Sequence, residues 1–144
     1  MNETTIVVGV DETDAARAAL RWAARHARDA GGTVAAVAVW QQPPMLAAGT
    51  GEMIAPVVDD AELEADARRW VSDAVAELPA GAAELVEGRV AHGDPKEVLL
   101  DQARGAAMLV LGNHRHGRVA GALLGSVALS CAHHADCPVV LVPS

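Results

Sequence analysis

Short apolar runs alternate with longer stretches of helical periodicity, and this alternation constrains the fold more than any other feature of the chain. Five runs are rich in Val, Ile, Leu and Ala, and they cover residues 5–10, 33–40, 85–91, 107–112 and 138–143. The first of them, TIVVGV (5–10), is a short β-branched run of the kind that is buried on both faces of a parallel sheet. The sequence therefore predicts five strands separated by helices.

Two long segments between the strands have the periodicity of amphipathic helices. Residues 14–30 place five Ala and Leu side chains on one helical face, and Gly31-Gly32 follow as a stop. A second helix is expected to start near Asp59, where three acidic residues suit a helix N-terminus, and to end before Pro79.

Two shorter helices complete the pattern. In GDPKEVLL (93–100), Asp94 is placed to cap a helix and Pro95 occupies its first position. The last helix is expected over 126–135, whereas 41–58 contains three of the seven prolines and is predicted to be an irregular loop. Strands that alternate with helices in this way predict a single α/β domain over 1–144 with a mainly parallel sheet.

Composition limits the partners of this domain. The net charge of −8 and the pI of about 5.1 argue against nonspecific binding to nucleic acid or to an anionic membrane. No window approaches 18 consecutive apolar residues, and MNETTIVVGV lacks the basic region and long apolar core of a signal peptide. We therefore expect a cytoplasmic protein with Cys131 and Cys137 reduced.

The predicted topology places three chain segments at one edge of the sheet. In folds of this class, ligands bind beyond the carboxyl ends of the strands, near the switch in strand order. Val10-Asp11, Val39-Trp40 and the chain from Gly112 onward should meet there.

The stretch LGNHRHGRVAGALLGSV (111–127) has the composition of an anion-binding segment. No acidic residue occurs between 102 and 135, a window that holds three arginines and four of the six histidines. Gly112 is expected to let the chain leave its strand sharply, and Gly125-Ser126 opens a helix whose free N–H groups attract anions. The alternative, equally supported by periodicity and charge, is that the glycines only shape a loop and Ser126 caps the helix.

Two stricter nucleotide-binding motifs are not satisfied. GNHRHGRV has the glycine spacing of a Walker A loop, but Arg118 stands where Lys is required and Val119 where a metal-binding hydroxyl is required. The first strand continues into VGVDETD instead of the glycine-rich dinucleotide fingerprint.

The chain nevertheless resembles the universal stress protein family over residues 4–143. That family has a Gly-x2-Gly-x9-Gly-Ser motif after its fourth strand, and this sequence gives Gly112, Arg115 at the second glycine position, and Gly125-Ser126 at the correct distance. The opening IVVGVDETDAARAALRWA, the segment GDPKEVLL and the terminal CPVVLVP also resemble the family pattern.

The resemblance implies a Rossmann-like five-stranded parallel sheet of order 3-2-1-4-5 with helices on both faces. It also implies homodimers, often formed through the last strand (138–143), and ATP binding in some members, with or without Mg²⁺ or Mn²⁺. The residues that it assigns to an adenine nucleotide are Val10, Asp11, Val39, Gly112, Gly125, Ser126 and Val127.

Arg115 is the departure from the family pattern. Its Cβ removes the close backbone approach that glycine allows, yet a guanidinium is itself a strong phosphate partner. His114, His116, Gly117 and Arg118 keep the loop small and cationic, which favours binding, so Arg115 and Gly117 join the candidate site.

Three groups of residues each have more than one possible interpretation from the sequence. Asp11 either contacts a ribose or a metal, or it caps the first helix in competition with Thr13 and Asp14. CAHHADC (131–137) offers zinc-ligand types, but its spacing fits no standard zinc site and favours structural roles. His114 and His116 have no neighbouring nucleophile or carboxylate, which disfavours a role as catalytic bases.

Three functions follow in order of preference. The first is a nucleotide-binding regulatory module with at most slow hydrolysis, since no base or Walker-type metal ligand is in place. The second is a stress-linked dimeric scaffold in which Arg115 closes the pocket. The third is an ATP-pyrophosphatase-like or adenylyl-transferring enzyme, which would need a denser glycine-serine loop than VGVDETD.

Overall fold

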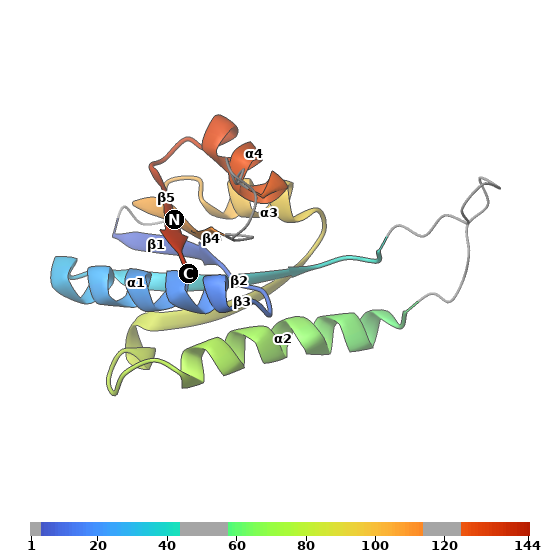
Figure 1. Cartoon of the computed structure of the whole chain (residues 1–144), viewed down its shortest axis with the longest axis horizontal. Coiled ribbons are helices and arrows are strands. Elements are labelled where there is room, and N and C mark those ends of the chain that lie inside the picture. The colour runs from blue at the N-terminus through green and yellow to red at the C-terminus, as the bar shows by residue number, and fades with distance from the viewer. Residues whose placement is uncertain (1–3, 44–57, 114–124) are drawn as a thin grey trace.

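The computed structural model describes residues 4–43, 58–113 and 125–144, and these form one parallel sheet between two layers of helices (Figure 1). The strands are β1 (Thr5–Gly9), β2 (Thr33–Trp40), β3 (Val86–His92), β4 (Met108–Asn113) and β5 (Val139–Pro143). The helices are α1 (Asp14–Ala30), α2 (Asp60–Ala76), α3 (Pro95–Gln102) and α4 (Ser126–His134), with a short 3₁₀ turn η1 (Ala83–Leu85) before β3.

The predicted α/β class and the strand order 3-2-1-4-5 are confirmed. β1 is central and pairs in parallel with β2 and β4, while β3 and β5 form the two edges. Several predicted strand bounds were wrong by one residue. Val10, for example, lies beyond β1, although its N–H still bonds the Val37 carbonyl at 2.8 Å.

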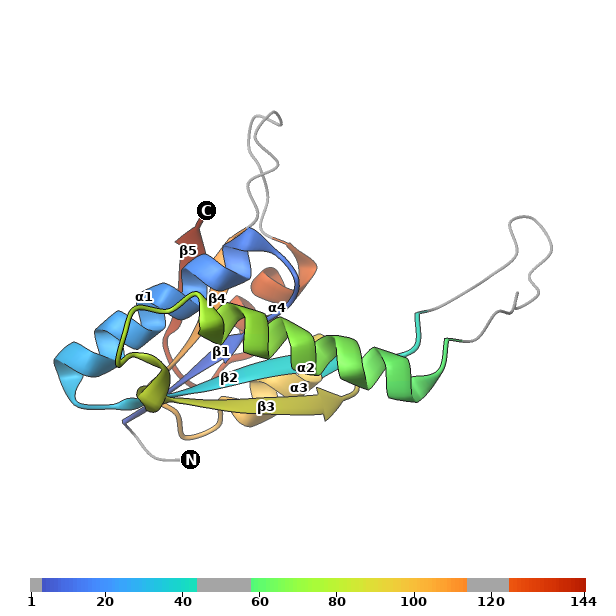
Figure 2. The same ribbon diagram turned by 90° about the horizontal axis from the view of Figure 1, so that it is seen from below.

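The two helical layers cover opposite faces of the sheet. α1 and α2 lie on one face, and α3 and α4 lie on the other (Figures 1 and 2). Side chains alternate along the strands, so Ile6 and Val8 of β1 face the first pair of helices while Val7 faces the second pair. The central strand β1 is therefore buried on both faces, as its apolar run predicts.

Three of the four helices start with the side-chain caps that their sequences favour. The side chains of Thr13, Asp59 and Asp94 accept hydrogen bonds from the backbone N–H groups of Ala16, Ala61 and Lys96, at 3.2, 2.9 and 3.0 Å. Gly31 ends α1 in the left-handed conformation, at φ 78°.

α4 differs from these three helices. Its N-cap is Gly125, which has no side chain to offer, and no side-chain hydrogen bond caps it within the described residues. The alternative in which Ser126 caps this helix is therefore wrong, because Ser126 is already the first helical residue.

Some predictions fall outside the described residues. Most of the predicted loop 41–58 lies in the undescribed stretch 44–57, and Arg115, Gly117, His114, His116 and Arg118 lie in 114–124. Among the helices that are described, none has both the length and the apolar character needed to cross a membrane.

Candidate functional site

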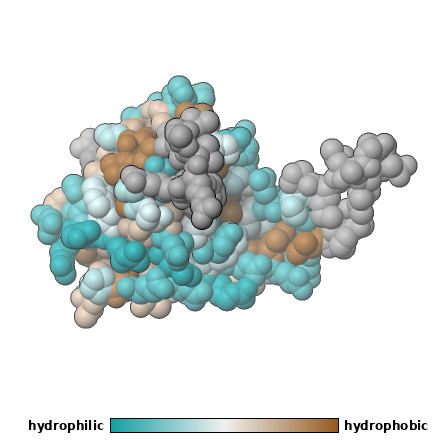
Figure 3. Space-filling model, viewed as in Figure 1, coloured by the Kyte–Doolittle hydropathy of each residue, from teal (hydrophilic) through white to brown (hydrophobic). Residues whose placement is uncertain are grey.

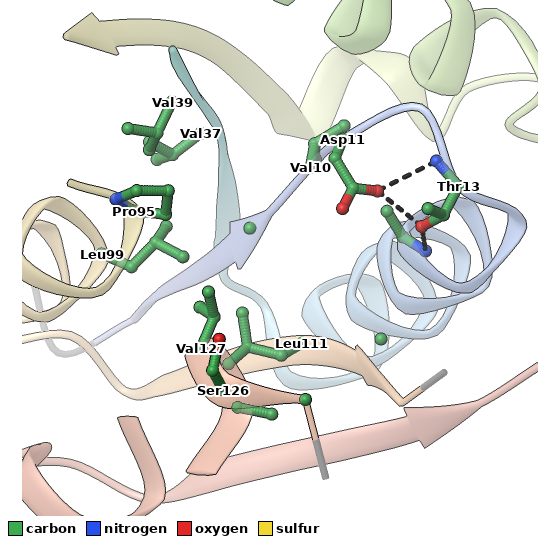
Figure 4. A pocket seen from close by; sticks show the side chains of 15 residues that line it. Val10, Asp11, Thr13, Val37, Val39, Pro95, Leu99, Leu111, Ser126 and Val127 are labelled. Carbon is green, nitrogen blue, oxygen red and sulfur yellow. Dashed lines mark hydrogen bonds between the residues drawn. The ribbon is translucent and has the colours of Figure 1, made fainter. Parts of the chain in front are cut away.

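A cavity of about 320 Å³ lies at the carboxyl edge of the sheet, between the ends of β1, β2 and β4 and the first turns of α3 and α4 (Figure 4). Seven of the nine predicted site residues line it: Val10, Asp11, Val39, Gly112, Gly125, Ser126 and Val127. The other two, Arg115 and Gly117, lie outside the described residues. The structure thus brings together, around one cavity, residues that are up to 117 positions apart in the sequence.

The N-terminus of α4 forms one wall of this cavity. Gly125, Ser126, Val127 and Ala128 all line it, and Gly125 and Ser126 are exposed. The first N–H groups of a helix have no partner within the helix, and the helix dipole adds partial positive charge there. Because Gly125 supplies no side-chain cap, this wall can offer N–H donors to an anion.

Asp11 stands across the cavity from α4 and is held in place by Thr13 (Figure 4). Its Oδ1 accepts hydrogen bonds from the Thr13 backbone N–H at 2.9 Å and from the Thr13 hydroxyl at 2.5 Å. The cap of α1 is Thr13, so of the alternatives for Asp11 the capping role is wrong. Its Oδ2 makes no hydrogen bond to the described residues, which leaves one carboxylate oxygen available beside the cavity.

A third, apolar wall contains the predicted residue Val39 and four residues that the sequence did not indicate. These four are Val37 of β2, Pro95 and Leu99 of α3 and Leu111 of β4. The spacing of apolar residues along β2 and α3 could have indicated three of them. Val37 and Val39 are two apart on a strand and share a face, and Pro95 and Leu99 are four apart on a helix. Gly9, Thr13, Ala16 and Ala128 complete the lining.

Gly112 is required for a reason other than the predicted one. It lies inside β4, paired with Val142, and does not turn the chain out of the strand. A Cβ at this position would lie 2.5 Å from the backbone carbonyl of Ala15 on α1. Glycine therefore lets the end of β4 approach the first turn of α1. At Gly125, by contrast, a Cβ would meet nothing within 4 Å.

The thiols near the C-terminus lie away from the cavity lining. Cys131 is fully buried between α4 and the sheet, Cys137 is partly buried, and both are free. Burial raises the pKa of the Cys131 thiol, and the neighbouring Cys137 raises it further. Within 4–43, 58–113 and 125–144, no group of three His, Cys, Asp or Glu side chains is placed to hold a metal ion.

The described lining offers several kinds of groups that can contact a ligand. Asp11 is its one ionisable side chain, and the remaining residues offer apolar surface, two hydroxyls and backbone N–H groups. Such a site suits a ligand with an apolar or aromatic part and a negatively charged part.

The chain has a parallel sheet with helices on both faces and a cavity at the switch in strand order. These features define the class of Rossmann-like α/β proteins, which bind ligands at the carboxyl edge of the sheet. The sequence profile described as the Universal stress protein family matches residues 3–143. The chain belongs to the universal stress protein family, as the sequence resemblance indicated.

Curated relatives in mycobacteria carry the same family name. A universal stress protein of Mycobacterium tuberculosis is 36% identical over 152 residues, covering 96% of this chain and 47% of the relative. One of Mycolicibacterium smegmatis is 33% identical over 147 residues, covering 97% of this chain and 48% of the relative. The chain thus spans about half the length of the curated relatives that it matches.

Solved structures share the fold over the whole chain. A universal stress protein family member from Burkholderia pseudomallei superposes with a TM-score of 0.71 at 26% identity, covering 99% of this chain and 97% of that one. The universal stress protein of Archaeoglobus fulgidus in complex with dAMP gives a TM-score of 0.68 at 25% identity, covering 99% of both chains.

Proposed function

We propose that this chain binds an adenine nucleotide, with ATP as the expected ligand, and works as a regulatory module of a stress response, not as a rapid enzyme. The observation that carries the proposal is the N-terminus of α4, which no described side chain caps and which opens on a cavity with an apolar wall and the Asp11 carboxylate opposite. The other helix starts are capped by Thr13, Asp59 and Asp94, so α4 is the exception among the described helices.

The lining divides into three parts that suit the three parts of a nucleotide. The apolar surface of Val37, Val39 and Leu99 would receive the base, and the available oxygen of Asp11 would accept a ribose hydroxyl. The N–H groups at Gly125, Ser126 and Val127 would receive phosphate oxygens, with Arg115 and Gly117 as further predicted contacts. Mg²⁺ or Mn²⁺ would be held mainly by the phosphates of ATP, because the described lining supplies one carboxylate.

The structure of the related Archaeoglobus protein also supports this proposal. It was solved with dAMP, an adenine nucleotide, and it shares the fold of this chain over 99% of its length. The proposed unit is a single domain over 1–144 that acts in the cytoplasm.

We further propose that two copies pair through the last strand, residues 138–143. β5 is an edge strand without a charged residue, and Figure 3 shows apolar side chains gathered over it. The opposite edge strand, β3, carries an exposed ion pair between Glu87 and Arg89, which disfavours strand addition. In analytical ultracentrifugation, Val142→Lys on β5 should dissociate the dimer, whereas Val86→Lys on β3 should leave it intact.

Isothermal titration with ATP, with and without Mg²⁺, tests the nucleotide proposal, and one residue offers a matched pair of variants. Ser126→Pro removes the N–H and the hydroxyl of the first helical residue, a position where proline is well tolerated. Gly125, at φ −59° and ψ 160°, already has a backbone that can precede proline. Ser126→Ala removes the hydroxyl alone.

We expect Ser126→Pro to raise the Kd for ATP about tenfold and Ser126→Ala to raise it less than threefold, the difference being one charge-assisted N–H donor. Equal Kd values for the natural chain and Ser126→Pro would contradict the proposed phosphate site. A natural chain that does not bind, but binds after Arg115→Gly, would instead support the scaffold with a closed pocket. Rapid release of product during the titration would support the enzyme.

A further inference from the structure

Three arginines of α1 line a second hollow, at the far end of the sheet from the carboxyl-edge cavity. Arg21, Arg25 and Arg28 stand three or four residues apart, so they lie on one stripe of the helix. The hollow has a volume of about 240 Å³ and is otherwise lined by Ala24, Pro79 and Ala82. Figure 2 shows the turn after α2, which contains Pro79 and Ala82, lying against the C-terminal half of α1.

The charge of this stripe is poorly balanced by the protein. Glu77 is shared, because its Oε2 lies 3.7 Å from Arg17 Nε and 3.9 Å from Arg21 Nη1. Arg25 and Arg28 form no ion pair with any described residue, even though Asp29 is four residues beyond Arg25. The remaining described arginines all pair with carboxylates: Arg17, Arg68, Arg69, Arg89 and Arg104.

A chain with a net charge of −8 has carboxylates to spare, so two unpaired arginines beside a third are unusual within it. Like charges three or four residues apart repel one another along a helix. The helix dipole explains Arg28, which lies in the last turn of α1, but its effect fades within one turn and does not reach Arg21 or Arg25. Arg21, Arg25 and Arg28 are all exposed, so the stripe presents this positive charge to solvent and is accessible to an anion.

The lining limits the chemistry of that partner. Guanidinium groups bind phosphate oxygens through paired N–H donors, and three of them around one hollow favour an anion of several charges. Ala24, Pro79 and Ala82 form small apolar walls, and no aromatic ring among the described lining residues could stack on a base. The volume is adequate for a few phosphate groups. These features favour a bare phosphate chain over a nucleotide.

We propose that Arg21, Arg25 and Arg28 form a second anion site that binds inorganic pyrophosphate or a short inorganic polyphosphate. This site is separate from the cavity beside α4, and the proposal stands whether or not that cavity takes ATP. The hollow lies between α1 and the turn that follows α2, and all of its cationic side chains come from α1.

Pyrophosphate titrated into the ¹⁵N-labelled natural chain at low ionic strength tests the proposal by NMR. The Nε–Hε signals of Arg21, Arg25 and Arg28 should shift together along one saturating curve. The double variant Arg25→Gln/Arg28→Gln should weaken pyrophosphate binding at least tenfold in a parallel calorimetric titration. Its affinity for ATP should change less than twofold.

The matched control is Arg68→Gln/Arg69→Gln on α2, which removes the same charge from exposed, ion-paired arginines. It should weaken pyrophosphate binding less than twofold, and urea unfolding should show that both double variants are folded. Equal losses in the two double variants would overturn the proposal in favour of a diffuse charge effect. A natural chain that does not bind pyrophosphate would also overturn the proposal. Signal shifts confined to the amides of residues 125–128 would overturn it too, because pyrophosphate would then occupy the cavity beside α4.

Discussion

The two faces of the sheet are built from the same strands but are covered very differently. α1 and α2 have 17 residues each, whereas α3 has 8 and α4 has 9. At about 1.5 Å per residue, α1 is about 25 Å long, close to the length of an eight-residue strand such as β2 at about 3.3 Å per residue. α3 spans only about 12 Å.

The two layers also differ in how they meet the carboxyl edge of the sheet. The long helices cover their face from one end of the strands to the other, and Ala19, Leu20 and Ala23 of α1 are 0% exposed. The short helices wall the cavity of about 320 Å³ with their first turns, at the carboxyl edge of the sheet. One layer therefore mainly stabilises the fold, and the other leaves room for a site.

The largest expected effect is a difference in stability between a substitution in α1 and one in α4. Leu20→Ala on α1 deletes a fully buried side chain in a closely packed face, and it should lower the free energy of unfolding by about 3–5 kcal/mol. Leu129→Ala on α4 removes a side chain that is 48% exposed and should cost less than about 0.5 kcal/mol. Urea unfolding measures both. Similar losses at the two positions would mean that α4 is packed as tightly as α1.

The two glycines of the family motif give the next contrast. Gly112→Ala places a Cβ 2.5 Å from the Ala15 carbonyl, so α1 must shift, and we expect a loss of about 1–3 kcal/mol. Gly125→Ala meets open space and should cost only a few tenths of a kcal/mol, the difference between Gly and Ala at an N-cap. Thermal unfolding of both variants checks this order, and a reversed order would show that Gly125, not Gly112, is required by packing.

These glycines also show how far the sequence alone could lead. Apolar periodicity and local start signals predicted the α/β class, helices that begin near residues 14 and 59, and the cap at Asp94, because those signals act within a few residues. The strand order came from the family resemblance. The approach of Gly112 to Ala15 joins positions 97 residues apart, and no local pattern encodes such a contact.

The site was predictable in part for the same reason. The carboxyl-edge rule and the family motif brought Val10, Val39 and Ser126 to one edge. The apolar wall from α3 depends on which faces of separate elements meet. The arginine hollow depends on how the turn after α2 lies against α1, which a scan for motifs does not reveal.

A third prediction compares the faces within a single strand. Val34 and Val37 of β2 are each 1% exposed, but Val34 faces α1 and α2 whereas Val37 lines the cavity. Val34→Leu adds a methylene to a filled core and should cost about 1–2 kcal/mol. Val37→Leu has free volume beside it and should cost less than about 0.5 kcal/mol while it weakens ATP binding. Chemical unfolding measures the stability of both variants, and calorimetry measures their affinity for ATP. Equal losses of stability would contradict the expectation that the core beside Val34 is packed more tightly than the cavity beside Val37.

The smallest expected effect concerns the thiols on the face covered by α3 and α4. Burial raises the pKa of both Cys131 and Cys137, so each carries less thiolate near neutral pH than an exposed cysteine. Alkylation by iodoacetamide at pH 7.5 should therefore be slow. The partly buried Cys137 should react before the fully buried Cys131, in an order that mass spectrometry of peptides resolves.

The direction of these pKa shifts determines how the stability of the protein changes with pH. A raised pKa in the folded state means that folding favours the neutral thiol, so this contribution is complete below the ordinary thiol pKa of 9.0. It is lost as the pH rises through the higher pKa of the folded state. Unfolding titrations from pH 8 to 10.5 should show a decline that is smaller in Cys131→Ala. Rapid alkylation of Cys131 at pH 7.5 would instead show that α4 opens readily, and the layer beside the cavity would then be the more mobile of the two.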